Sequence, residues 1–298
     1  MTKKILLMIL LLAISVTRIF AQKKFSDNPD SAMFVTKDID NFWIAFADFE
    51  RDSTINNFGS KYLAIGTEGI KGFTPYRIQS AQHLFSVVKQ RKIDYEKVKA
   101  NTLRVKEKEK QCRSTFYALK YLYPQAKFPP VYFVIGAYNS GGTSNSNGLF
   151  IGAEMQTNID NIPYIVAHEL IHFQQTFANN RPTLLQQSIM EGSADFIGEL
   201  ISGTNTNLPA NKYGNEHKEE LCKEFVEKMN GNNFTDWLYG TSKKDDRPND
   251  LGYWIGYQIT AQYYAHVNDK RQAIFEILNI KDYNEFLKKS GYLDEYMK

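Results

Sequence analysis

The chain has 298 residues, of which 43% are hydrophobic and 23% are charged. These proportions are those of an ordinary globular protein, and the length suits one large domain or two modest ones. The formal net charge of +3 comes from Lys3, Lys4 and Arg18, since residues 22–298 contain 33 basic and 33 acidic residues. A neutral chain of this kind has no overall attraction for nucleic acid or anionic lipid, so we expect neither as a partner.

The first 21 residues have the pattern of a cleavable secretory signal peptide. Two lysines precede the 12-residue apolar run ILLMILLLAISV, and Ala21 supplies a small residue at the expected cleavage point. The run is too short to span a bilayer comfortably, although an uncleaved membrane anchor is the alternative. No cysteine is near the cleavage point, which argues against a lipid anchor. We therefore expect a periplasmic or secreted protein with no stable membrane anchor after cleavage.

Export also permits a disulfide. Cys112 and Cys222 are the two cysteines, so a single pairing is possible. The sequence leaves open whether they meet or stay as free buried thiols.

The region 22–125 is expected to be mostly helical. Apolar residues recur near a 3.6-residue period in 39–49 and again in 76–90, and a charged helical stretch follows at 94–111. The alternating charges of that stretch are typical of a solvated helix face. Pro124 is expected to stop the last helix of this region.

A change of character near residue 126 predicts a small sheet. The segment PPVYFVIGAY (129–138) has the β-branched and aromatic composition of a buried strand, and GLFIGAEM (148–155) is similar. A polar loop, 139–148, separates them and predicts a hairpin with a long connection. The pattern from residue 161 onward is helical. The fold class is therefore α+β, with a core domain at 126–298 that forms one compact unit with residues 22–125.

Two histidines four residues apart stand in the stretch VAHELIHFQQ, as His168 and His172, with Glu169 directly after the first. Asn161 can cap a helix here, and Pro163 suits its first turn. On a helix the two histidines share one face and can reach one cation. Glu169 is rotated about 100° from His168, so it can address a water molecule and not the metal itself.

A third ligand is expected on the following helix. Thr183 and Gln186 form a capping box and Gly203 suits the position after the helix end. Between them Glu191 and Asp195 stand four residues apart, and the small residues Gly-Ser-Ala that separate them would let this helix pack closely on the histidine helix. Catalytic zinc takes three protein ligands and one open position. We therefore predict a Zn²⁺ site of His168, His172 and Glu191, with Asp195 accepting the other ring N–H of a liganding histidine, which we expect to be His168.

This arrangement resembles the gluzincin metallopeptidases, which have HExxH on one helix and Glu-x-x-x-Asp on a second. The segments AHELIHFQQ, EGSADFIGELISG and LGYWIGYQI are similar to the predicted zinc-dependent proteases related to the gliding-motility B-type lipoproteins of Bacteroidota, over about residues 125–265. The resemblance implies a mostly helical, zincin-like fold, a peptide or protein substrate, and hydrolysis with Glu169 as general base. The chain lacks the lipid-accepting cysteine of those lipoproteins, so a direct motility role does not follow.

Two further parts of the site are expected from later and earlier segments. A tyrosine on the helix 250–266 can donate to the oxyanion, and we expect Tyr257 in this role, with Tyr253 as the next candidate and as a substrate contact. Both could equally be core residues. In gluzincins an edge strand before the metal helix pairs with extended substrate, which implies substrate contacts in the segment 148–155. These expected contacts are Gly148, Phe150, Gly152 and Glu154.

Several alternatives remain open. Asp195 could be the third ligand in place of Glu191, but Glu191 would then lack a role on the same helix face. An extended metzincin motif fails because position 178 is Ala178 and not histidine. His217 and His266 are weaker candidates for the oxyanion donor and are expected to be solvated. His83 is expected to be a partly buried histidine with a hydrogen-bond partner and not a metal ligand. A different class of function is a non-catalytic envelope or motility-associated protein that keeps the metal-binding scaffold, but a scaffold has no need for the base Glu169.

Overall fold

A computed structural model of the protein describes residues 25–176, 181–239 and 247–297. The signal peptide expected at 1–21 lies outside these residues. None of the helices in the described part combines the length and the apolar character that crossing a membrane requires.

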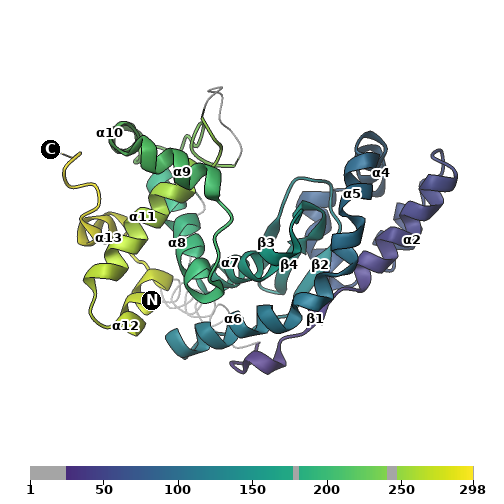
Figure 1. Ribbon diagram of the computed structural model, residues 1–298, viewed down its shortest axis with the longest axis horizontal. Helices are drawn as coiled ribbons and strands as arrows, with labels where there is room; N and C mark the ends of the chain where they lie inside the picture. Colours follow the sequence, from purple (N-terminus) through teal and green to yellow (C-terminus); the bar gives the residue numbers. More distant parts are fainter. Residues whose placement is uncertain (1–24, 177–180, 240–246, 298) are drawn as a thin grey trace, which may run out of the picture. The chain divides into compact units, whose positions relative to one another are not determined.

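The chain divides into two compact units (Figure 1). Unit 1 takes the described part of Met1–Lys106 together with Pro124–Thr157, and unit 2 takes Glu107–Tyr123 and Asn158–Lys298. The class expected from the sequence, a mostly helical α+β protein with a small sheet, is confirmed. The domain boundary near residue 125 stays a prediction.

Unit 1 contains a four-stranded mixed sheet in the order β1-β2-β4-β3. Its strands are β1 (Phe34–Val35), β2 (Val131–Val134), β3 (Gly142–Asn145) and β4 (Gly148–Gly152). The strand β2 is parallel to both β1 and β4, whereas β3 is antiparallel to β4. Every residue of β2 and β4 is buried, as their unbroken apolar composition requires.

The hairpin expected between 129–138 and 148–155 is wrong in its pairing. These two segments form the parallel strands β2 and β4, in the register Val131 opposite Leu149. The antiparallel partner of β4 is β3, which arises inside the polar loop and turns back at Asn145 opposite Gly148. The expectation that the segment 148–155 is an edge strand is also wrong, because β2 and β3 pair with its two sides.

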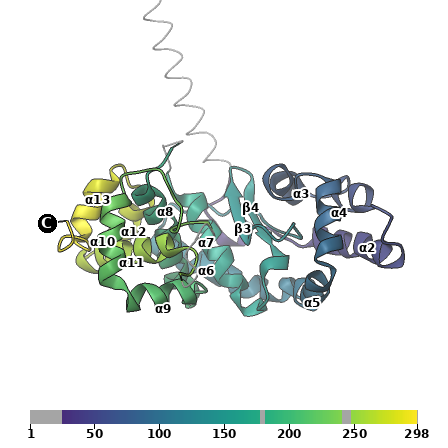
Figure 2. The ribbon, with the colours of Figure 1, turned by 90° about the horizontal axis from the view of Figure 1, so that it is seen from above.

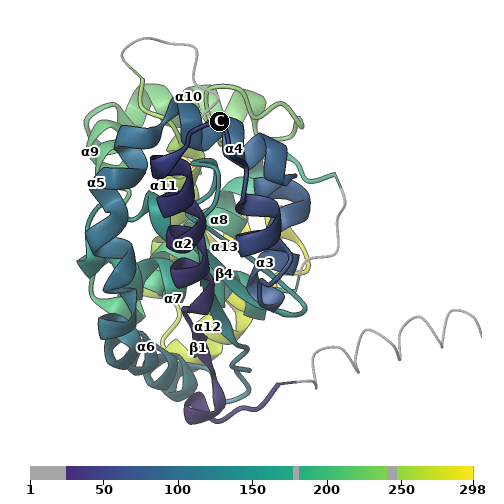
Figure 3. The ribbon, with the colours of Figure 1, turned by 90° about the vertical axis from the view of Figure 1, so that its right-hand side faces the viewer.

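The helices of unit 1 are α2 (Lys37–Arg51), α3 (Glu68–Phe73), α4 (Ala81–Gln90) and α5 (Lys92–Leu103), with short π- and 3₁₀-helical turns at Gly59–Leu63, Thr74–Ile78, Val105–Lys108 and Ala153–Met155. The helices α2 and α3 contact the sheet, α5 packs on α2, and α4 packs on α5 (Figure 3). The aromatic rings of Phe42, Phe46 and Tyr95 form a buried cluster, with the Phe42 and Tyr95 ring centroids 5.4 Å apart. Within the apolar stretch 39–49, Ile44 is exposed.

Unit 2 is helical (Figure 2). Its helices are α6 (Glu109–Leu122), α7 (Ile162–Gln174), α8 (Leu184–Ser202), α9 (Leu208–Glu216), α10 (Lys218–Lys228), α11 (Leu251–His266), α12 (Lys270–Leu278) and α13 (Tyr283–Ser290). The helix α8 lies between α7 and α11 and packs on both. Cys112 and Cys222 are buried free thiols, so the structure holds no bond between them.

Glycines bring α8 and α11 into backbone contact. A Cβ atom added to Gly256 would lie 1.7 Å from the Ser188 carbonyl oxygen, and one added to Gly192 would lie 2.1 Å from the Tyr257 backbone nitrogen. The expectation that Gly192 allows α8 to approach the histidine helix is therefore wrong, because this glycine faces α11. Gly198 faces the backbone of His168 on α7 instead.

Candidate metal centre

The helix α7 carries the two histidines on one face. It begins at Ile162 with Pro163 in its first turn, as expected. The expected cap differs, since the Asn161 side chain makes no capping bond and Asn158 caps the short 3₁₀ turn that leads into the helix. Two of the three polar residues of the HExxH stretch, His168 and Glu169, are buried, where unpaired charges are costly.

The helix α8 begins and ends as its sequence predicts. Thr183 and Gln186 form a reciprocal capping box, and Gly203 closes the helix in the left-handed region at φ 78°. The buried face of α8 carries Glu191 and Asp195, which lie one turn apart and are 7% and 4% exposed.

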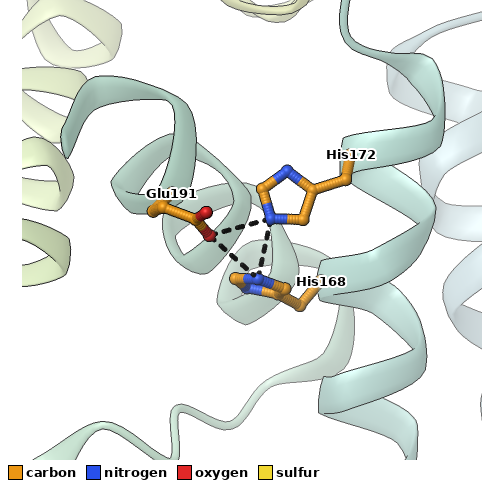
Figure 4. A group of neighbouring side chains, drawn as sticks. All are labelled: His168, His172 and Glu191. Carbon is orange, nitrogen blue, oxygen red and sulfur yellow. Dashed lines mark hydrogen bonds and ion pairs between the residues drawn. The ribbon is translucent and has the colours of Figure 1, made fainter. Parts of the chain in front are cut away.

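Three ligand atoms from these helices converge (Figure 4). The Glu191 Oε2 atom lies 3.0 Å from His172 Nε2 and 3.6 Å from His168 Nε2, and the two Nε2 atoms are 3.0 Å apart. Ligands about 2.1 Å from a tetrahedral zinc ion are spaced by about 3.4 Å. The three atoms therefore have the spacing of zinc ligands, and they form the one such group among the described residues.

The opposite ring nitrogens fix the tautomers of both histidines. His168 Nδ1 lies 2.8 Å from an Asp195 oxygen, and His172 Nδ1 lies 2.8 Å from Gln175 Oε1. The Gln175 amide nitrogen donates to the Met190 carbonyl, which leaves its oxygen to accept from the ring. Each Nδ1 thus holds a proton, and in the neutral rings both Nε2 lone pairs face Glu191. Three lone pairs at this spacing need a cation between them, so these residues fit a metal ion.

Without that cation, the surroundings of His168 and His172 favour the protonated form of each imidazole. Burial alone would lower the pKa of His168, but its hydrogen bonds to Asp195 and Glu191 outweigh this and raise the pKa well above its usual range. Burial alone would likewise raise the pKa of Glu191. The charge of His172 and the hydrogen bonds to both rings outweigh this effect and hold the pKa of Glu191 well below the usual range. Positive charge is therefore stabilised at the point where the three side chains meet.

Glu169 lies close to this cluster on the same helix. It is 5% exposed, and its negative charge contributes to raising the pKa of both His168 and His172. Its carboxylate is not one of the three converging ligand groups. The action of Glu169 beside a metal ion and its role as a base stay predictions.

Three contacts of the site were not expected from the sequence. Gln175 orients His172, and Gln187 and Tyr239 both donate to the second oxygen of Glu191, at 3.0 and 3.1 Å. Gln187 stands four residues before Glu191 on α8, and Gln175, the residue directly after α7, stands three residues after His172. These spacings could have revealed both glutamines. Tyr239 comes from the segment between α10 and α11, and no sequence pattern around it indicates a contact with Glu191.

The tyrosines expected to donate to the oxyanion differ in position. The Tyr253 ring stacks beside that of His168, with centroids 6.2 Å apart. The Tyr257 ring packs on Phe196, and its hydroxyl is hydrogen-bonded to Glu199, one turn beyond Asp195. The role of Tyr257 as oxyanion donor and that of Tyr253 as a substrate contact stay predictions.

The three remaining histidines lie outside the cluster. His83 Nδ1 is 2.9 Å from the Ile78 carbonyl, His217 stacks on Tyr213, and His266 is the exposed last residue of α11.

The substrate contacts expected in unit 1 belong to an interior strand. Gly148, Phe150 and Gly152 lie in β4 and are buried, and Glu154 follows it with no exposed surface. The backbone N–H groups of Gly136 and Tyr138 donate to Glu154. Substrate binding by these residues stays a prediction.

A buried histidine, a partly buried histidine and a glutamate on two packed helices, with both rings held at Nδ1, form the arrangement typical of HExxH metal-site proteins. The chain belongs to the family described as predicted Zn-dependent protease (DUF2268), which matches residues 98–287. No curated protein and no solved structure matches the chain.

Proposed function

We propose that this protein is an exported zinc metallopeptidase. One observation carries the proposal. The Nε2 atoms of His168 and His172 and one oxygen of Glu191 lie 3.0–3.6 Å apart, while Asp195 and Gln175 hold the opposite ring nitrogens. The family description supports zinc and proteolysis. Export rests on the signal-peptide pattern of residues 1–21.

His168, His172 and Glu191 would hold Zn²⁺, which when bound lowers the pKa of a coordinated water and polarises the carbonyl of a peptide bond. Asp195 and Gln175 keep each imidazole in the tautomer that presents Nε2. Glu169 takes a proton from the attacking water and passes it to the leaving amine, so it serves first as base and then as acid. The substrate is a peptide or protein. A relation to gliding-motility proteins stays a prediction.

The decisive experiment combines metal analysis with a peptide-library digest. Protein purified without chelator should contain close to one zinc per chain, and the double change His168→Ala, His172→Ala should abolish that binding. Wild type should cleave the library, whereas Glu169→Gln should keep zinc and lose about 10²–10⁴ in rate. If Glu169→Gln cleaves as fast as wild type, Glu169 is not the base. If wild type binds zinc and cleaves nothing, the non-catalytic scaffold replaces this proposal.

A further inference from the structure

The second carboxylate oxygen of Glu191 is already occupied by protein donors. Gln187 Nε2 lies 3.0 Å from Glu191 Oε1, and the Tyr239 hydroxyl lies 3.1 Å from the same atom. The other oxygen, Oε2, faces the two histidines. The carboxylate therefore has two distinct ends, one toward protein donors and one toward the ligand nitrogens.

Gln187 is held firmly in place. It lies one helical turn before Glu191 on α8 and is 5% exposed, so its amide cannot swing into solvent without leaving buried surroundings. It also shares a hydrogen bond with Tyr239, which links the two donors to each other.

Tyr239 is 51% exposed, yet its backbone is fixed by the two residues before it. Trp237 and Leu238 are fully buried, and the Trp237 carbonyl accepts from the Gly252 N–H at 2.7 Å at the start of α11. Tyr239 itself has φ 60°, a left-handed conformation that a non-glycine residue adopts at a cost and that its surroundings must hold. The buried residues Trp237 and Leu238 and the left-handed backbone of Tyr239 thus position its hydroxyl against Glu191.

We propose that Gln187 and Tyr239 are positioning residues that restrict Glu191 to a single ligand oxygen. The inference rests on the proposed metal site. A carboxylate can bind a cation through one oxygen or through both, and two donors on Oε1 favour the first mode. A glutamate that offers both oxygens would occupy one more coordination position, which hydrolysis needs for water and substrate. Gln187 and Tyr239 therefore preserve an open position without touching the metal.

Cobalt provides a readout that is independent of activity. Four-coordinate Co²⁺ absorbs visible light more strongly than five- or six-coordinate Co²⁺, so the spectrum reports how many ligands are bound. Wild type loaded with Co²⁺ alone should give the strong spectrum. The double change Gln187→Met, Tyr239→Phe keeps side-chain size and removes both donors. At equal bound cobalt its absorption should fall several-fold, and Tyr239→Phe alone should give a smaller decrease.

The matched control is Tyr263→Phe, which also removes a tyrosine hydroxyl from a carboxylate, that of Glu276 on α12. Its cobalt spectrum should equal that of wild type. If the double variant does not fold, the single Tyr239→Phe change decides by the same measurement. A variant spectrum equal to that of wild type, or a weak wild-type spectrum, overturns this inference and leaves the metallopeptidase proposal standing. Failure of wild type to bind either cobalt or zinc overturns both.

Discussion

Each imidazole of the cluster uses its two nitrogens for different tasks. The Nδ1 atoms of His168 and His172 are held at 2.8 Å by Asp195 and Gln175, and the Nε2 atoms point toward Glu191. The Asp195 oxygen that accepts from His168 also accepts from the Tyr164 hydroxyl at 2.6 Å. A carboxylate held in this way fixes both the orientation and the tautomer of the ring.

The change Asp195→Asn should therefore weaken zinc binding by about 10–100-fold with the fold retained. An amide has the size of the carboxylate but removes its charge and can place an N–H where the ring N–H needs an acceptor. Zinc titration against a competing chelator measures the effect. Glu191→Gln should lose more affinity, because it removes a charged ligand. If Asp195→Asn abolishes binding while Glu191→Gln binds normally, Asp195 is the third ligand.

Glu154 is a buried acid in unit 1 whose pKa is raised, in contrast to the lowered pKa of Glu191. It has no exposed surface, and its second oxygen has no hydrogen-bond partner. Burial raises the pKa of this carboxyl to about 7, although backbone N–H groups at Gly136 and Tyr138 partly oppose the rise. The folded state therefore favours the protonated form of Glu154 more than the unfolded state does.

Stability of unit 1 should fall as the pH rises from about 4.5 to about 7. Over this range the unfolded carboxyl ionises while the folded one, whose pKa is about 7, stays protonated, and the loss of stability is on the order of 3 kcal/mol. Glu154→Gln should remove this part of the pH dependence and stabilise the protein at pH 8. Urea denaturation at several pH values measures it, with the exposed Glu50→Gln change as control. Equal pH dependence in wild type and Glu154→Gln would refute the assignment.

At the scale of elements, the contact between α8 and α11 determines where Glu191 lies. Gly256 leaves no room for a side chain against the Ser188 carbonyl, and Ser188 precedes Glu191 by less than one turn. A methyl group at this point must move one of the two backbones, and overpacking of this kind costs about 1–3 kcal/mol or more.

Gly256→Ala should therefore destabilise the protein by at least about 2 kcal/mol and lower its zinc affinity, because α8 carries both Glu191 and Asp195. Denaturant unfolding and zinc titration measure the two effects. Gly231→Ala is the matched control, since a Cβ there would meet only the Lys228 carbonyl at an ordinary 3.4 Å. Wild-type stability in Gly256→Ala would show that the two helices can separate freely.

The sequence predicts elements well where a local pattern decides them. The capping box and Gly203 mark both ends of α8, and histidines spaced by four residues mark one face of α7. Strand pairing is a long-range property, so no local pattern distinguishes a parallel β2–β4 pair from a hairpin. The strand β3 is missed for another reason. It consists of polar and glycine residues, and its pairing with β4 alone makes it a strand.

The site follows the same division. Its candidate residues were predictable because His168 and His172 lie one turn apart on α7, and Glu191 and Asp195 lie one turn apart on α8. Tyr239 was not, since it reaches Glu191 from 48 residues further along the chain. Likewise, helical spacing could not distinguish Tyr253, which stacks beside His168, from Tyr257, which meets Phe196 and Glu199.

At the scale of the whole molecule, the proposed metal belongs to unit 2 alone. Its candidate ligands and the residues that orient them come from α7, α8, the residue after α7 and the segment between α10 and α11, all within Asn158–Lys298. A metal that binds only the folded state stabilises it in proportion to the logarithm of its concentration over Kd, by about 4 kcal/mol at a thousandfold excess. The part of the chain that gains this stability is the one that contains the ligands.

Chelation should consequently loosen the two units unequally. After zinc is removed, hydrogen exchange should speed up in α7 and α8, because the bond between these helices through the ion is lost and their buried acids and imidazoles are left facing one another. Peptides from β2 and β4 in unit 1 should exchange at their previous rates. Mass spectrometry of exchanged peptides measures both, and added zinc should reverse the change. Equal acceleration in β2, β4, α7 and α8 would show that the two units unfold together, whereas no acceleration in α7 and α8 would show that no metal joins them.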